Sequence, residues 1–98
     1  MQEQIQNTEN KLDELRKRID LVDQQILLLL SARNDFVKKV AQLKKENGIP
    51  VYDEFREKQL INDWIGSSKI LGLSEEFVKS ILELIISESR RIQKEIIE

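Results

Sequence analysis

The chain has 98 residues, of which 40% are hydrophobic and 35% are charged, and this length provides for one hydrophobic core. With 16 basic and 18 acidic side chains the net charge is -2, so no continuous basic face is available for a nucleic-acid backbone, and nucleic acid is not an expected partner. Because the sequence lacks histidine and cysteine, imidazole bases, thiol nucleophiles, disulfides and the usual zinc sites are excluded, and we predict no metal and no cofactor.

The first predicted element is one very long helix, from about Thr8 to Glu46, and the turn that begins at Asn47 ends it. At 1.5 Å per residue this helix is about 60 Å long, which exceeds the diameter of a compact chain of this size. Two short helices of the same chain cover only part of its apolar face, so we predict an intertwined homodimer. This face, called the apolar stripe below, consists of Leu12, Leu15, Ile19, Val22, Ile26, Leu29, Phe36, Val40 and Leu43.

Arg33 occupies a position in the apolar stripe where a leucine is expected. A buried guanidinium without a partner costs several kcal/mol, so we expect an anionic group beside it, either a protein carboxylate or a carboxylate of a bound ligand. Lys44 returns to nearly the same face about 16 Å further along the helix, where two cations can close on a small ligand. Alternatively, Lys44 only complements the helix dipole and faces water.

Arg16 lies about 25 Å before Arg33 on this helix and points in another direction, so one chain cannot bring both to a small site. In a dimer of antiparallel long helices, Arg16 of one chain can reach the region around Arg33 of the other. The alternative is an ordinary surface charge beside Lys17 and Arg18.

Two shorter helices follow, from about Asp53 to Ser67 and from about Glu75 to Ile97. No strand pattern is present, so the predicted fold is all-α, a single domain over residues 1–98. We predict that Asp53 and Ser74 cap the N-termini of these helices. Asp53, Arg56 and Glu57 share one side of the second helix, although such charged clusters are also common on surfaces.

On the third helix, Ser89 interrupts an apolar seam between Ile85 and Ile92, and Gln93 lies one turn beyond it. These polar groups can face a ligand. Alternatively, Ser89 bonds to a carbonyl of its own helix and Gln93 is solvated.

Taken in order, these residues resemble the all-helical (type II) chorismate mutases over nearly the whole chain. The resemblance implies a stand-alone isomerase that converts chorismate to prephenate in phenylalanine and tyrosine biosynthesis. It also implies a domain-swapped homodimeric helical bundle with two pockets, each built mainly from one chain. The matching positions are Leu15, Arg16, Ile19, Asp23, Arg33, Lys44, the segment from Gly48 to Glu57, Leu84, Ile85, Ile86, Ser89 and Gln93.

The resemblance also implies a role for each polar position. Arg33 and the partner subunit's Arg16 would hold the two substrate carboxylates, and Lys44 and Gln93 would bracket the ether oxygen. Glu57 would bind the ring hydroxyl, with Asp53 near it. The other implied lining residues are Arg56, Ser89, Val40 and Ile86, and the residues implied to be catalytic are Lys44, Gln93, Arg33 and Glu57.

Two other functions fit parts of the pattern. An isochorismate-pyruvate lyase of the same fold would use similar cations, but lyase relatives generally lack the carboxylate that Glu57 supplies. A non-catalytic helical regulatory or interaction module fits the periodicity alone, but not the joint presence of the polar set. A partner enzyme from the same pathway cannot be identified from the sequence.

The longest apolar block, from Leu27 to Leu30, is far shorter than the about 20 residues that cross a bilayer. The polar N-terminus also lacks the apolar core of a signal peptide. We therefore expect a cytoplasmic protein with no membrane partner.

Overall fold

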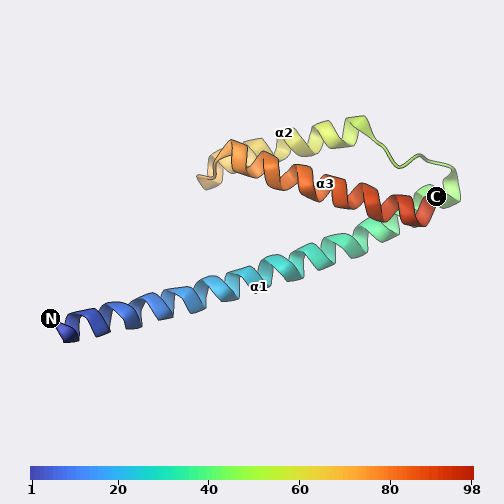
Figure 1. Cartoon of the computed structure of the whole chain (residues 1–98). Coiled ribbons are helices and arrows are strands. Elements are labelled where there is room, and N and C mark those ends of the chain that lie inside the picture. Colours follow the sequence, from blue (N-terminus) through green and yellow to red (C-terminus); the bar gives the residue numbers. More distant parts are fainter. The chain divides into compact units, whose positions relative to one another are not determined.

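The computed structural model describes residues 1–98 and contains three helices, α1 (Gln2–Asn47), α2 (Glu54–Leu71) and α3 (Glu75–Ile97), and no strand (Figure 1). The predicted all-α class is confirmed. None of the helices combines the length and the apolar character that a membrane span requires. The chain divides into two compact units, residues 1–33 and residues 34–98.

Two helix ends differ from the predicted ones. α1 begins at Gln2 rather than near Thr8, since the preceding glutamines and glutamate favour helix without belonging to the apolar stripe. α2 continues past Ser67 to Leu71, because Gly66 is accommodated inside the helix. Gly72 then ends α2 in the left-handed conformation, with φ of 70°, and its N–H donates to the carbonyl of Ser68.

The first unit consists of the N-terminal part of α1 alone. Its apolar side chains are largely open to solvent in a single chain: Leu15 is 54% exposed, Ile19 57% and Leu29 70%. A helix with such an uncovered apolar face has no core of its own.

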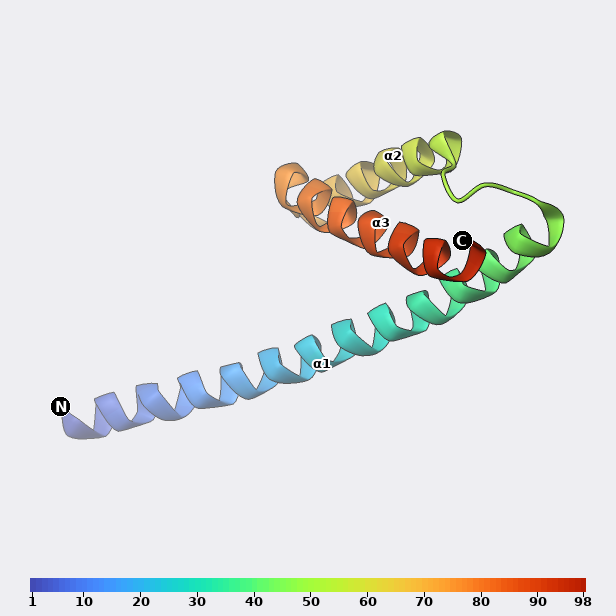
Figure 2. The ribbon, with the colours of Figure 1, turned by 45° about the vertical axis from the view of Figure 1, so that its right-hand side comes forward.

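The second unit contains the end of α1 together with α2 and α3. Both views show α2 and α3 side by side, connected by a short turn (Figures 1 and 2). α3 is amphipathic and buries one face, so it supplies most of the core. The buried apolar side chains are Ala41 of α1 and Val78, Leu82, Ile86 and Ile92 of α3.

Both short helices begin at the predicted N-caps. The side chain of Asp53 accepts a hydrogen bond from the backbone N–H of Arg56, and that of Ser74 accepts one from Phe77. Glu75 in the first turn of α3 complements the helix dipole. The caps fix where α2 and α3 start, and thereby which of their residues lie on the side where the two helices meet.

Candidate functional site

Lys44, near the end of α1, connects three segments of the second unit. Its Nζ donates to Oε1 of Gln93 on α3 at 2.8 Å and to the carbonyl oxygen of Val51, in the turn before α2, at 2.9 Å. Lys44 and Gln93 are 49 residues apart in the sequence. The sequence left open whether Lys44 simply faces water, and this contact decides against that alternative.

The Lys44 and Gln93 contact leaves hydrogen-bond donors on both side chains. A lysine ammonium carries three N–H donors, and two of them are used here. Gln93 accepts through its amide oxygen, which leaves the amide NH₂ to donate elsewhere. Each of the two side chains therefore keeps at least one N–H with which it can donate to a further acceptor.

Glu57, on α2, is held by Arg90 of α3, a residue that the sequence analysis missed. Nε of Arg90 donates to Oε2 of Glu57 at 2.8 Å, and Nη2 donates to Oε1. The hydrogen bond to Glu57 and the negative charge of Glu57 raise the pKa of Arg90 and outweigh the lowering of this pKa by burial. The guanidinium therefore stays charged. Arg90 lies three residues before Gln93 and hence on the same side of α3, which is the signal that points to it in the sequence.

Asp53 and Arg56 make their hydrogen bonds within the first turns of α2. Oδ1 of Asp53 accepts from the backbone N–H of Arg56 at 3.0 Å, and Nη1 of Arg56 donates to Oε1 of Gln59 at 2.9 Å. Both residues are exposed. In the single chain, these contacts tie the side chain of Asp53 to the helix end, and Asp53 meets Glu57 only through the backbone hydrogen bond from the N–H of Glu57 to the carbonyl of Asp53.

The remaining lining residues of the second unit differ in burial. Ser89 is buried, and its Oγ donates to the carbonyl of Ile85 at 2.9 Å. This is the bond to a carbonyl of its own helix that was given above as the alternative to a ligand contact. Ile86, three residues before Ser89 on α3, is also buried, whereas Val40 is 45% exposed.

The two remaining arginines of the predicted site, Arg16 and Arg33, belong to the first unit. Arg16 is exposed, and its Nη1 lies 4.0 Å from Oδ1 of Asp13, one turn earlier in α1. Arg33 is half-buried. An exposed pair such as Arg16 and Asp13 contributes little to stability, so it leaves Arg16 available for another anion.

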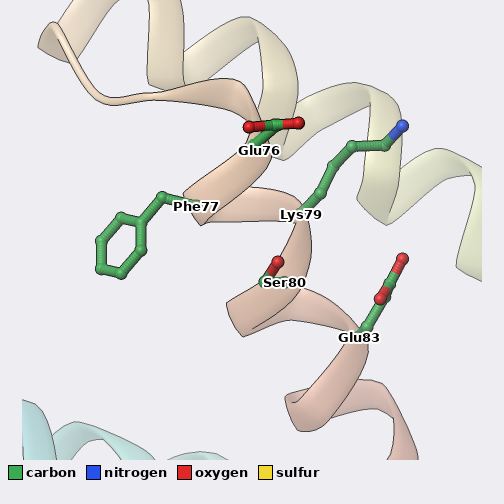
Figure 3. A pocket seen from close by; sticks show the side chains of 5 residues that line it. All are labelled: Glu76, Phe77, Lys79, Ser80 and Glu83. Atoms are coloured by element: carbon green, nitrogen blue, oxygen red, sulfur yellow. The ribbon is translucent and has the colours of Figure 1, made fainter.

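A shallow hollow on the N-terminal half of α3 contains none of the predicted site residues. It is lined by Glu76, Phe77, Lys79, Ser80 and Glu83, all from this one helix (Figure 3). Figure 3 shows Phe77 pointing away from Lys79 and Glu83. The aromatic ring and the charged groups therefore do not enclose a common space. This hollow is an open helix face and not a second candidate site.

Comparison with known proteins gives a match to the family model of type II chorismate mutase over residues 15–94, a range that includes every predicted site residue. The chorismate mutase of Methanocaldococcus jannaschii is 35% identical over 88 residues, which cover 90% of this chain and 89% of that protein. A bifunctional chorismate mutase/prephenate dehydratase of Buchnera aphidicola is 35% identical over 91% of this chain, but the match spans only 23% of that longer protein. A secreted chorismate mutase of Yersinia pestis is 32% identical over 66% of this chain and 35% of its own length.

Proposed function

The chain belongs to the type II chorismate mutase family, and we propose that Lys44 and Gln93 are the pair that stabilises the breaking bond of its substrate. The protein is an isomerase that converts chorismate to prephenate in the biosynthesis of aromatic amino acids. The hydrogen bond of 2.8 Å between Lys44 and Gln93, which joins the ends of α1 and α3, is the observation that supports the assignment of this pair.

The chemistry of the rearrangement explains why one cationic and one neutral hydrogen-bond donor suffice for catalysis. In the rearrangement an ether C–O bond breaks and a C–C bond forms within one molecule, so neither a nucleophile nor a proton transfer is needed. Negative charge grows on the ether oxygen when C–O cleavage runs ahead of C–C formation. The ammonium of Lys44 and the amide NH₂ of Gln93 meet that charge, and prealigned donors of this kind stabilise a transition state more than a ground state.

The substrate is a dianion, and arginines are suited to its carboxylates because the planar guanidinium binds both oxygens and keeps its charge. We assign one carboxylate to Arg33 and the other to the partner subunit's Arg16. Arg33 thus interrupts the apolar stripe because a ligand carboxylate meets it there. This assignment requires a homodimer, which the exposed apolar side chains of the first unit support.

Glu57 is assigned to the ring hydroxyl for a chemical reason. A carboxylate only accepts hydrogen bonds, and the hydroxyl is the one O–H donor on the chorismate dianion. Glu57 would repel either substrate carboxylate, so the hydroxyl is the group it can bind. In this proposal Asp53, Arg56, Ser89, Val40 and Ile86 line the same pocket.

The test is incubation of the purified protein with chorismate, followed by acid treatment and detection of phenylpyruvate, which forms from prephenate. We expect product from the wild type and a loss of about 10²- to 10³-fold in kcat for Lys44→Met, since one oxyanion donor is removed. Parallel incubation with isochorismate tests the lyase alternative, which the mutase names of the relatives do not favour. Release of pyruvate from isochorismate with no prephenate from chorismate would contradict the proposal.

The cytoplasmic location stays a prediction, because a relative from Yersinia pestis is a secreted chorismate mutase. Fractionation of the source cells, with detection of the protein in each fraction, tests it.

A further inference from the structure

Arg90 and Glu57 form a second pair beside Lys44 and Gln93, and the mechanism above does not use Arg90. The two residues are 33 positions apart, on α3 and α2, and the guanidinium engages both carboxylate oxygens through Nε and Nη2. The Glu57 side chain is only 19% exposed. Two parallel hydrogen bonds fix the plane of a carboxylate as well as its position.

A third residue contacts the guanidinium. The ring centroid of Tyr52 lies 5.0 Å from the guanidinium carbon of Arg90, within cation–π distance. Tyr52 directly follows Val51, whose carbonyl accepts the hydrogen bond from Lys44. The turn before α2 therefore contacts both pairs, so the orientation of Glu57 is set relative to that of Lys44.

The pairing leaves Glu57 able to accept a further hydrogen bond. A carboxylate offers about four lone-pair directions, and Arg90 takes two of them. The charge of Arg90 also offsets that of Glu57, which otherwise repels a substrate with two negative charges. Glu57 can thus accept a hydrogen bond from the substrate in a fixed direction, while Arg90 balances its negative charge.

We propose that Arg90 is a positioning residue, which holds the Glu57 carboxylate as the acceptor for the ring hydroxyl and so makes the site selective for a substrate that carries this hydroxyl. The inference rests on the proposed role of Glu57. Arg90 acts through Glu57 and does not touch the reacting atoms.

The test compares two substrates, chorismate and an analogue in which hydrogen replaces the ring hydroxyl, in the wild type, Arg90→Gln and Arg91→Gln. Arg91 is the matched control, because it is exposed on the same helix and pairs with Glu88 and Glu95. For Arg90→Gln we expect kcat/KM with chorismate to fall about 10- to 100-fold, the size of a lost hydrogen bond to a charged group, and kcat/KM with the analogue to fall by a smaller factor, because only the unpaired charge of Glu57 opposes the analogue. Arg91→Gln should change neither value.

The ratio of the two kcat/KM values is the decisive readout, because a fraction of unfolded enzyme lowers both values equally. The inference is overturned when Arg90→Gln loses the same factor with both substrates, or loses nothing with chorismate. Arg90→Lys keeps the charge without the two-pronged geometry, so its ratio should lie between those of the wild type and Arg90→Gln.

Glu57→Met removes the acceptor oxygens and separates this inference from its premise. A wild type without chorismate turnover contradicts the proposed function itself. When Glu57→Met leaves the preference for the hydroxyl intact, the role of Glu57 fails and the inference with it. When Glu57→Met loses the preference and Arg90→Gln keeps it, only the role of Arg90 fails.

Discussion

At the scale of single residues, the side chain at position 93 decides how the activity depends on pH. Gln93 accepts from Lys44 through its amide oxygen and keeps an NH₂ that can donate at any pH. The amide of Gln93 does not ionise, so this donor is the same at every pH between 6 and 8. We therefore expect kcat/KM of the wild type to be nearly constant from pH 6 to pH 8, and a steep loss over that range would contradict the assignment of this pair.

Replacing Gln93 with glutamate makes the donor titratable. Only the protonated acid can donate to the ether oxygen, and the ionised form also neutralises Lys44. For Gln93→Glu we expect kcat/KM at pH 7 to fall by about 10²- to 10³-fold and to recover as the pH falls toward the ordinary glutamic acid value of about 4.3. The measurement is the pH profile of kcat/KM.

Gln93→Met is the control for this profile, because methionine has a similar length and no N–H or O–H donor. Its activity should stay low at every pH. Recovery of Gln93→Met in acid, or wild-type activity of Gln93→Glu at pH 7, is the result that removes Gln93 from the mechanism.

The residues of the candidate site were predictable to different degrees. The apolar stripe marked Arg33 as unusual, because a charge in an apolar repeat is visible in local spacing. The contact between Lys44 and Gln93 joins positions 49 apart, so only the family resemblance led to it. Arg90 was missed although its spacing from Gln93 puts it on the site's side of α3, because its partner Glu57 lies 33 positions away and no periodicity connects residues on two different helices.

At the scale of elements, the helix starts of α2 and α3 followed from local chemistry, whereas the start of α1 and the end of α2 did not. Asp53 and Ser74 are side chains that accept from backbone N–H groups, and both cap a helix as predicted. The prediction for α2 gave too much weight to Gly66, which costs a helix only about 1 kcal/mol. Gly72, with its positive φ, is where the backbone leaves the helix.

The N-cap of α2 allows the structural role of Asp53 to be separated from a role in binding. Asp53→Ala removes the acceptor for the backbone N–H of Arg56, so we expect the free energy of unfolding to fall by about 1 kcal/mol. Asp53→Ser keeps a capping oxygen and should retain most of that stability. Urea unfolding at a fixed protein concentration measures both changes.

The values of kcat/KM for these variants test a role of Asp53 in binding. Asp53→Ser keeps the cap of α2 and removes the carboxylate that the proposal places in the pocket lining, so it should lower kcat/KM while it keeps most of the stability. A serine variant that is stable and has the wild-type kcat/KM would limit Asp53 to capping the helix.

At the scale of the whole molecule, the isolated chain leaves two requirements unmet. The apolar side chains of the first unit are uncovered, and burial of apolar surface contributes about 25 cal/mol per Å². Arg16, exposed on the same unit, pairs only with Asp13 at 4.0 Å, and the proposed site needs a second arginine for the second carboxylate. A second copy of the chain meets both requirements, which is why the dimer and the shared pocket form one proposal.

Mixing two inactive variants tests the shared pocket directly. Arg16→Ala and Arg33→Ala should each lose nearly all activity as homodimers, since every pocket lacks one of its two arginines. In a heterodimer, the pocket of the Arg16→Ala chain has its own Arg33 and receives the intact Arg16 of the Arg33→Ala chain, whereas the other pocket lacks both. Equal amounts that exchange subunits freely give half heterodimers, so about one quarter of the pockets are complete.

The activity of the mixture should therefore rise to about one quarter of the wild-type value after unfolding and refolding the two variants together. The control is each variant refolded alone, which should stay inactive, and gel filtration of all samples should give the mass of a dimer. Activity that stays at the level of the separate variants, although heterodimers form, means that each pocket draws its arginines from one chain.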